Sequence, residues 1–187
     1  MPRIFFAELI ASAMITFPYF FIDPRLRYCA VTEGVAVGAL IYAAVWVVYP
    51  LSGAQINPII TFAFGLTRRI SFFYVPFYWC GQFIGAGLSM ALAFYVSPFG
   101  KLSPATALTL PRNGITVIQA LWLELVITFL LLVVILAGTD EARDPVWTMA
   151  DGSTLACVYM LMYFVITVLT VGKTNFMKIF VTPTLSH

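Results

Sequence analysis

The chain has 187 residues, of which 61% are hydrophobic and 10% are charged, and its formal net charge is +2. Soluble globular domains carry about 25% charged residues, so this composition is typical of a membrane protein and excludes an ordinary soluble domain. The small net charge gives no indication of nucleic-acid binding, and the apolar content is enough for about five or six membrane spans.

The stretch 4–21 predicts the first membrane span. It is too long for a secretory signal, contains Glu8, and offers no small-residue cleavage site before Asp23. A second span is predicted over 30–49. We expect Pro50 to end its helix, because proline cannot continue the backbone hydrogen-bond pattern.

The next segment, Ser-Gly-Ala-Gln-Ile-Asn-Pro at 52–58, is unusual for a membrane protein. Asn57 is a strong N-cap and Pro58 suits the first helical position, so a helix is predicted over 58–67. That helix rises about 15 Å, half of a hydrocarbon core of about 30 Å. Irregular backbone at membrane depth is tolerated only where protein buries it or where it lines a watery cavity. The predicted half-helix is therefore part of a pore or a re-entrant packing element without one.

Charge supports an inward orientation of this half-helix. Arg68 and Arg69 at its C-terminal end complement the negative pole of the helix dipole and meet the membrane interface. Its N-terminal end, with the Asn57 amide, then points toward the middle of the bilayer. A partial positive charge there would repel a permeating cation. Together with Arg3, the arginine pair favours a cytoplasmic N-terminus, although the loop charges on the two sides are balanced.

The remaining predicted spans cover 71–96, 117–137 and 153–171. Glycines in the predicted spans indicate close helix contacts. Gly34 with Gly38, and Gly81 with Gly85, have the four-residue spacing that lets a second helix approach closely.

Two buried acidic residues indicate an internal repeat. Glu8 is followed four positions later by Ser12, and Glu124 by Thr128, each pair on one helix face. An odd number of crossings before the second half makes this an inverted repeat. Carboxylates in apolar spans turn toward partners or cavities, so we expect Glu8 and Glu124 to brace pore-lining loops rather than to carry protons.

Catalytic chemistry has no support in the sequence. Cys29, Cys80 and Cys157 lack metal spacing and are odd in number, so we interpret them as small apolar side chains. His187 is the only histidine. Because these residues do not form a catalytic nucleophile set or a metal-ligand set, we expect no enzyme, no cofactor and no metal site.

These features resemble the aquaporin and aquaglyceroporin family over residues 5–172. The matching motifs are Ala-Glu-x-x-x-Ser at 7–12, Ser-Gly-Ala-Gln-Ile-Asn-Pro-Ile-Ile-Thr at 52–61, Gly-Gln at 81–82 with Gly-Ala at 85–86, and Glu-x-x-x-Thr at 124–128. The resemblance implies an all-α hourglass fold in which half-helices meet at mid-membrane, with a pore through each subunit of a homo- or hetero-tetramer. It also implies a plasma-membrane protein with cytoplasmic termini. The implied function is passage of water or small neutral solutes such as glycerol.

The resemblance also implies roles for individual residues. Asn57 corresponds to the first pore asparagine, which donates a hydrogen bond to a passing solute, and Pro58 matches the family. Ile59 replaces the usual alanine and is expected to narrow the pore centre. Val37 and Val165 stand at positions where the family often has larger filter residues, which favours a wider constriction.

The C-terminal part departs from the family pattern. The repeat spacing carried over to the second half places a second pore asparagine near 173, where Asn175 is close and Lys178 takes the place of the filter arginine. No proline follows Asn175. We expect an aquaporin-like domain over 1–172, with five transmembrane helices and one re-entrant half-helix, and a divergent tail over 173–187 without a sixth span. The tail is a relic of a working loop, or an unrelated ending from a variant transcript, gene error or fragment.

Two functions follow from this reading. In the first, the chain is a facilitative channel for water or small neutral solutes. In the second, it is a non-conducting, C-terminally truncated subunit that modulates the assembly or trafficking of full-length channels.

Overall fold

The described part of the chain is built from helices. The structure, a computed structural model, describes residues 1–21, 30–97, 116–140 and 152–169, and every regular element in these ranges is helical. In chain order they are α1 (Pro2–Tyr19), α2 (Ala30–Ser52), α3 (Pro58–Leu66), the 3₁₀ helix η2 (Phe72–Tyr74), α4 (Val75–Val96), α6 (Val117–Gly138) and α7 (Gly152–Leu169). The predicted tail over 173–187 lies outside the described residues.

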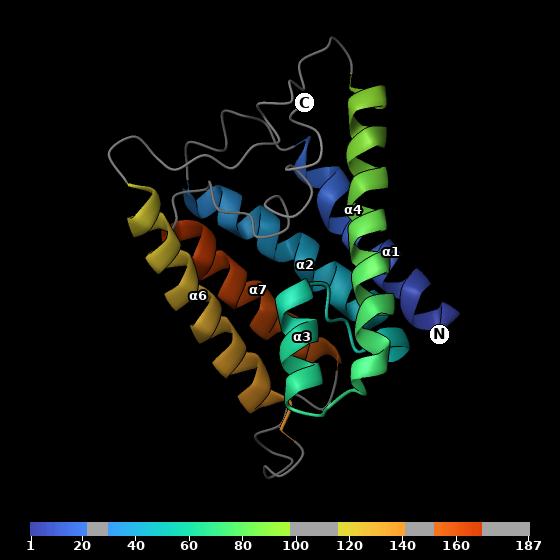
Figure 1. Cartoon of the computed structure of the whole chain (residues 1–187). Helices are drawn as coiled ribbons and strands as arrows, with labels where there is room; N and C mark the ends of the chain where they lie inside the picture. The colour runs from blue at the N-terminus through green and yellow to red at the C-terminus, as the bar shows by residue number, and fades with distance from the viewer. Residues whose placement is uncertain (22–29, 98–115, 141–151, 170–187) are drawn as a thin grey trace.

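Long helices surround the short helix α3 (Figure 1). α2 packs extensively on α7 and α1 packs on α4 and α2, whereas α6 makes smaller contacts with α7 and α3. α3 lies between α4 and α6. The helix predicted over 58–67 is present as α3, and its 9 residues rise about 14 Å, roughly half of a hydrocarbon core.

The end of α2 differs from the sequence prediction. We expected Pro50 to end this helix, which was wrong, because α2 continues through the proline to Ser52. The Gly53 amide donates to the Tyr49 carbonyl at 2.9 Å, so the helical hydrogen-bond pattern persists past the proline. Pro50 removes only the amide donor that would bond to the Trp46 carbonyl, and the helix tolerates this single loss near its end.

Glycines bring two pairs of helices close together. A Cβ added at Gly34 or Gly38 of α2 would lie 2.9 Å from the nearest atom of α7. On α4, a Cβ added at Gly81 or Gly85 would overlap backbone atoms of α1. The two glycine pairs singled out in the sequence therefore lie at the α2–α7 and α1–α4 contacts, where small residues allow backbones to approach.

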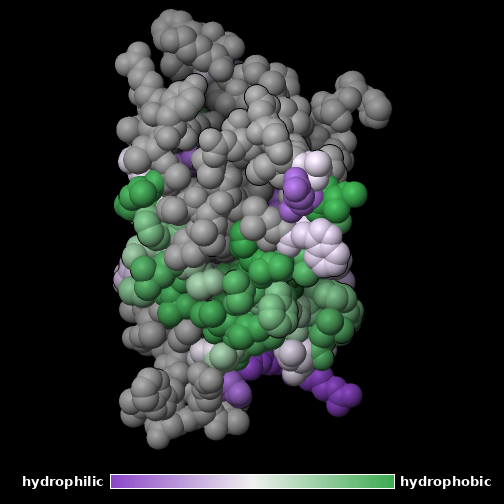
Figure 2. Space-filling model, turned by 90° about the vertical axis from the view of Figure 1, so that its left-hand side faces the viewer, coloured by the Kyte–Doolittle hydropathy of each residue, from purple (hydrophilic) through white to green (hydrophobic). Residues whose placement is uncertain are grey.

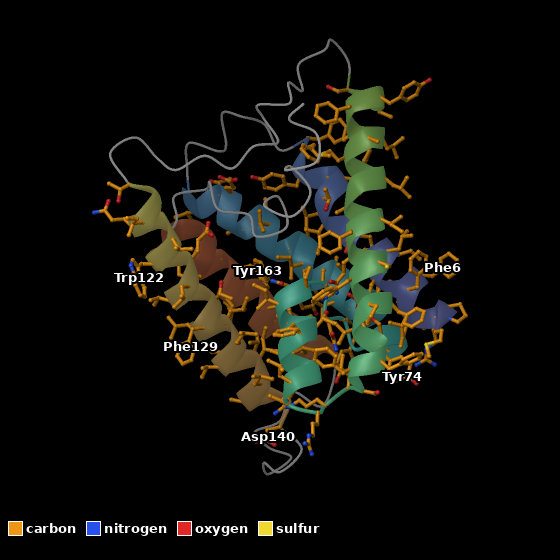
Figure 3. All side chains as sticks on the ribbon, in the orientation of Figure 1. Phe6, Tyr74, Trp122, Phe129, Asp140 and Tyr163 are labelled. Carbon is orange, nitrogen blue, oxygen red and sulfur yellow. The ribbon has the colours of Figure 1, made fainter. Side chains whose placement is uncertain are left out.

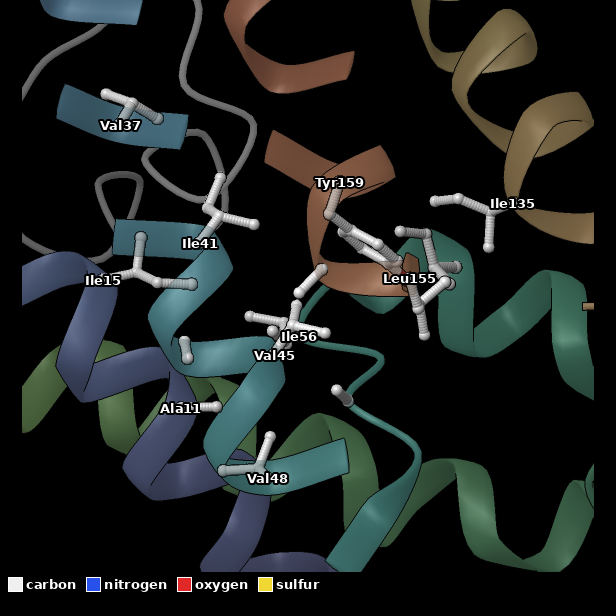
Figure 4. Close-up of a cluster of buried hydrophobic side chains, with 14 of the residues drawn as sticks. Ala11, Ile15, Val37, Ile41, Val45, Val48, Ile56, Ile135, Leu155 and Tyr159 are labelled. Atoms are coloured by element: carbon white, nitrogen blue, oxygen red, sulfur yellow. The ribbon is translucent and has the colours of Figure 1, made fainter. Parts of the chain in front are cut away.

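The hydrophobic core lies where α1, α2, α7 and the segment before α3 meet (Figure 4). Ala11 of α1 and Val45 of α2 are 0% exposed, and Leu155 of α7 is 2% exposed. Ile56, between α2 and α3, packs into the same cluster. The irregular segment is therefore fixed by core packing as well as by its hydrogen bonds.

The outer surface of the helices is apolar. Among the described helices, Val31–Ser52 and Phe72–Val96 are long and apolar enough to cross a membrane, and Glu124–Gly138 and Leu155–Phe164 are shorter apolar stretches. Figure 2 shows hydrophobic side chains gathered in a band across one face, with hydrophilic residues above and below it. Among the described side chains of α6, the large exposed apolar ones are Ile118, Leu121, Trp122, Leu125, Val126, Phe129, Leu130 and Val133. Such a contiguous apolar surface suits hydrocarbon rather than water.

The α1–α4 contact predicts that Gly85→Ala destabilises the protein. The added methyl group would meet the Leu9 backbone, which cannot swing aside as a flexible side chain would. We expect overpacking to cost about 1–3 kcal/mol and to lower the thermal unfolding midpoint in detergent. Gly87→Ala is the matched control, because a Cβ at Gly87 meets no described atom within 4 Å. Equal midpoints for the two variants would contradict this account of the contact.

Candidate functional site

The backbone between α2 and α3 has an unusual conformation. Gly53, Ala54 and Ile56 have positive φ angles of 79°, 49° and 55°. For residues with a Cβ, the left-handed region costs roughly 1–2 kcal/mol each, so Ala54 and Ile56 need contacts that hold them there. In this conformation the amides of Gln55 and Ile56 point toward α1.

The contacts that hold this loop converge on Glu8 of α1. Its Oε1 accepts hydrogen bonds from the Ser52 hydroxyl at 2.6 Å and the Gln55 amide at 3.1 Å. Its Oε2 accepts from the Ile56 amide at 2.8 Å and from Nε2 of Gln82 at 2.7 Å. Glu8 is 0% exposed, so these donors replace the water that a carboxylate would otherwise bind.

Further polar side chains extend this network to α3 and α4. Nε2 of Gln82 also donates to the Thr61 hydroxyl at 3.1 Å, and that hydroxyl donates to the Asn57 carbonyl at 3.1 Å. The Tyr78 hydroxyl donates to the Ser52 carbonyl at 2.5 Å. The loop is thereby connected to α1, α3 and α4, and its geometry depends on all three helices.

Asn57 caps the N-terminus of α3. Its Oδ1 accepts a hydrogen bond from the Ile59 amide at 2.9 Å, and Pro58 occupies the first helical position. Its Nδ2 donates to the Tyr163 hydroxyl of α7 at 3.2 Å. The Pro58 carbonyl accepts from Nε1 of Trp79 on α4 at 3.0 Å, so the helix tip is fixed from a second side.

The positive end of α3 lies inside the molecule. Asn57 is 2% exposed, and in Figure 3 Tyr163 lies near the α3 end that faces the centre of the helices. Asp140 is labelled in the same view near the opposite, outer end of α3. The partial positive charge of the helix N-terminus therefore faces the interior, where no bulk water screens it.

A cavity of about 780 Å³ reaches the loop from one side. Its described lining residues are Tyr49, Ser52, Gly53, Gln55, Phe64, Thr67, Arg68, Arg69, Ile70, Ile135, Thr139, Asp140, Leu155 and Tyr159. The lining contains charged groups near the outer end of α3 and uncharged groups near the loop. Asn57 and Tyr163 are not among these lining residues, so the cavity stops short of the helix tip.

Arg69 fixes one wall of this cavity. Its guanidinium donates to the Leu136 carbonyl at 2.7 Å and to the Thr139 hydroxyl, both at the C-terminal end of α6. The arginine also lies over the Phe64 ring, 5.6 Å from its centroid. We expected the arginine pair to complement the dipole of their own helix. The Arg69 side chain also donates to the terminal carbonyl and hydroxyl of α6, and its complement to the dipole of α3 stays a prediction.

The remaining residues singled out in the sequence lie at several places. Val37 is 2% exposed and belongs to the hydrophobic core cluster, while Ile59 is partly buried. Glu124 is partly buried on α6 and forms no hydrogen bond with the described part of the chain. The Val165 side chain, Asn175 and Lys178 lie outside the described residues.

Several residues of the site carried no role in the sequence analysis. Ser52, Thr61 and Gln82 are polar residues in apolar surroundings, and that property marks them as candidates for buried contacts. Gln82 stood in a recognised motif without an assigned partner. Tyr78 and Tyr163 lie in aromatic-rich helices, where their hydroxyl partners leave no sequence signal.

Residues 3–178 match the sequence model of the family described as Major intrinsic protein. The chain is 31% identical to aquaporin-5 of Homo sapiens over 147 residues, which is 74% of this chain and 53% of that relative. It is also 31% identical to aquaporin NIP2-1 of Zea mays over 118 residues, which is 63% of this chain and 38% of that relative. The chain therefore spans about half the length of these relatives or less.

The fold is similar to that of a solved structure. The X-ray structure of the aquaglyceroporin from Plasmodium falciparum superposes with a TM-score of 0.78, covering 97% of this chain and 81% of that chain. At 20% sequence identity this similarity concerns the fold alone. The helices therefore have the arrangement of an aquaporin-like protein.

The hydrogen bonds of Glu8 predict that Glu8→Gln destabilises the loop. An amide in place of one carboxylate oxygen turns a donor toward donors of Ser52, Gln55, Ile56 or Gln82. Each buried group left without a partner costs about 1–3 kcal/mol, so we expect a clearly lower thermal unfolding midpoint in detergent.

Glu124→Gln is the comparison variant for this measurement. It makes the same chemical change on α6, where the described residues offer Glu124 no hydrogen bond. Its midpoint should fall less than that of Glu8→Gln. An equal or larger fall for Glu124→Gln would contradict the special role of the Glu8 contacts.

Proposed function

The chain belongs to the major intrinsic protein family, whose members are membrane channels and not enzymes, and on this premise we propose that it conducts water or small neutral solutes past Asn57. The observation that carries the proposal is the loop at 52–57. Its left-handed residues are held by Glu8, and its last residue caps an inward-pointing half-helix.

This geometry suits neutral solutes. The N-terminal dipole of α3 disfavours cations at the helix tip, while the Asn57 amide can donate a hydrogen bond to an oxygen of a passing molecule. The cavity of about 780 Å³ gives solutes access to the loop from one side. Its polar lining, with Gln55 and Thr139, favours hydrated molecules over apolar ones.

The choice between water and larger solutes is part of the proposal. Small apolar side chains at Val37 and Val165 support a filter that is wide enough for glycerol, whereas Ile59 supports a narrow pore centre. We therefore propose water as one substrate and small polyols such as glycerol as another, with the pore centre setting the upper size.

The proposed assembly is a homo- or hetero-tetramer in the plasma membrane, with a cytoplasmic N-terminus. The apolar outer faces of α2, α4 and α6 support contacts with lipid and with neighbouring subunits. Trp46 and Val47 of α2 and Leu88 and Leu92 of α4 are exposed examples of such side chains.

Reconstituted protein tests the proposal directly. Proteoliposomes with the purified chain should shrink faster than empty liposomes after a hyperosmotic shock, and should re-swell faster when the external solute is glycerol. Stopped-flow light scattering measures both rates. Rates equal to those of empty liposomes would contradict the channel proposal and favour a non-conducting subunit.

The dipole of α3 predicts the effect of Asn57→Asp. Aspartate keeps an N-cap oxygen, but its charge neutralises the positive end of α3 and attracts cations. We expect a cation conductance in voltage clamp that the unchanged protein lacks. Asn57→Ser keeps a neutral N-cap and is the matched control. This variant should show no cation conductance. No difference between the two variants would contradict cation exclusion by the α3 tip.

A further inference from the structure

The Tyr163 hydroxyl accepts a hydrogen bond from Asn57, the residue on which the proposed pore depends. The Asn57 side chain has one acceptor oxygen and two N–H donors. Its Oδ1 is used by the Ile59 amide, and one N–H is donated to the Tyr163 hydroxyl at 3.2 Å. A solute that reaches Asn57 must therefore use the second N–H or replace Tyr163.

The Tyr163 ring lies next to a tyrosine that lines the cavity. Tyr159, one turn earlier on α7, lines the cavity, and its ring stacks on that of Tyr163 with centroids 6.5 Å apart and planes inclined by 13°. Tyr163 itself and Asn57 lie beyond the described cavity lining. The stacked pair therefore links the cavity lining to the tip of α3, since the Tyr163 hydroxyl accepts the hydrogen bond from the Asn57 amide.

The backbone of α7 packs closely against α2. Gly34 and Gly38 of α2 lie so close to α7 that an added Cβ would be 2.9 Å from the nearest α7 atom. Such close packing fixes the distance between α7 and the core. Rotation of the Tyr163 side chain separates it from Asn57 without a change of the helix positions.

We propose that Tyr163 limits permeation, because its hydroxyl, bound to the Asn57 amide, closes the passage at the tip of α3 until that hydrogen bond breaks. This inference rests on the proposed channel function. A single neutral hydrogen bond is weak enough to open thermally, so Tyr163 slows passage rather than blocking it. Tyr163 is thus a residue that sets the rate and the solute size, in addition to the family motif.

The hydrogen bond is tested without any transport measurement. The chain has three asparagines, at 57, 113 and 175, so selective ¹⁵N-asparagine labelling gives few side-chain amide signals. The pair of side-chain amide signals that disappears in Asn57→Gln is assigned to Asn57. Tyr163→Phe keeps the ring and removes the hydroxyl, and should shift that signal. Tyr42→Phe is the matched control, because Tyr42 is a partly buried tyrosine on a different helix, α2. This variant should leave the Asn57 signal in place. An unchanged Asn57 signal in Tyr163→Phe would overturn the inference.

Transport then tests the role of the contact. In proteoliposomes, Tyr163→Phe should raise the water permeability roughly two- to tenfold, the factor that loss of one hydrogen bond allows. Tyr163→Leu also removes the ring and should raise glycerol permeability further, while Tyr42→Phe should match the unchanged chain. Size-exclusion profiles and circular dichroism establish that each variant is folded.

The outcomes separate the inference from the channel proposal. If the unchanged chain conducts and neither Tyr163 variant conducts faster, the inference is overturned while the channel proposal stands. If only the Tyr163 variants conduct, the channel proposal fails for the unchanged chain, and the inference that Tyr163 slows passage without blocking it is overturned. If no protein exceeds empty liposomes, the channel proposal fails and the limiting role fails with it, while the amide signal still reports whether the hydrogen bond exists.

Discussion

The fold around the candidate site depends on the hydrogen bonds between Glu8 and the loop at 52–56. A fully buried carboxylate is unstable without donors, and a loop with left-handed residues leaves amides that need an acceptor. In this chain each requirement satisfies the other, since two amides, a hydroxyl and a side-chain amide meet the two Glu8 oxygens. Removal of the carboxylate would leave both the conformation and the buried donors without support.

The orientation of α3 follows from this anchoring. The loop leaves α2 after Ser52 and is held against α1, so that α3 begins at a buried point and runs outward. Gln82 and Thr61 then connect the same carboxylate to the carbonyl of Asn57. The helix dipole, the asparagine amide and the cavity are consequently arranged by one polar cluster in an otherwise apolar protein.

Packing of the long helices complements this polar cluster. Glycines at the α2–α7 and α1–α4 contacts allow close backbone approach, which brings α1 within reach of the loop and Tyr163 within reach of Asn57. In lipid, packing of this kind replaces the hydrophobic driving force that stabilises soluble proteins. The exposed apolar side chains of α6 and α4 face outward, where lipid surrounds the protein.

The sequence by itself determined the helical class, the short helix after Asn57 and the importance of a buried glutamate, because these depend on local signals. Apolar runs, an N-cap followed by proline, and a charge within an apolar stretch act within a few residues. The same local reasoning was wrong at Pro50, where the helix continues. Only the tertiary structure decided which donors meet Glu8 and that Tyr163 meets Asn57. Those partners are 106 positions apart in the second case, and their meeting depends on how α7 packs against α2 rather than on any local pattern.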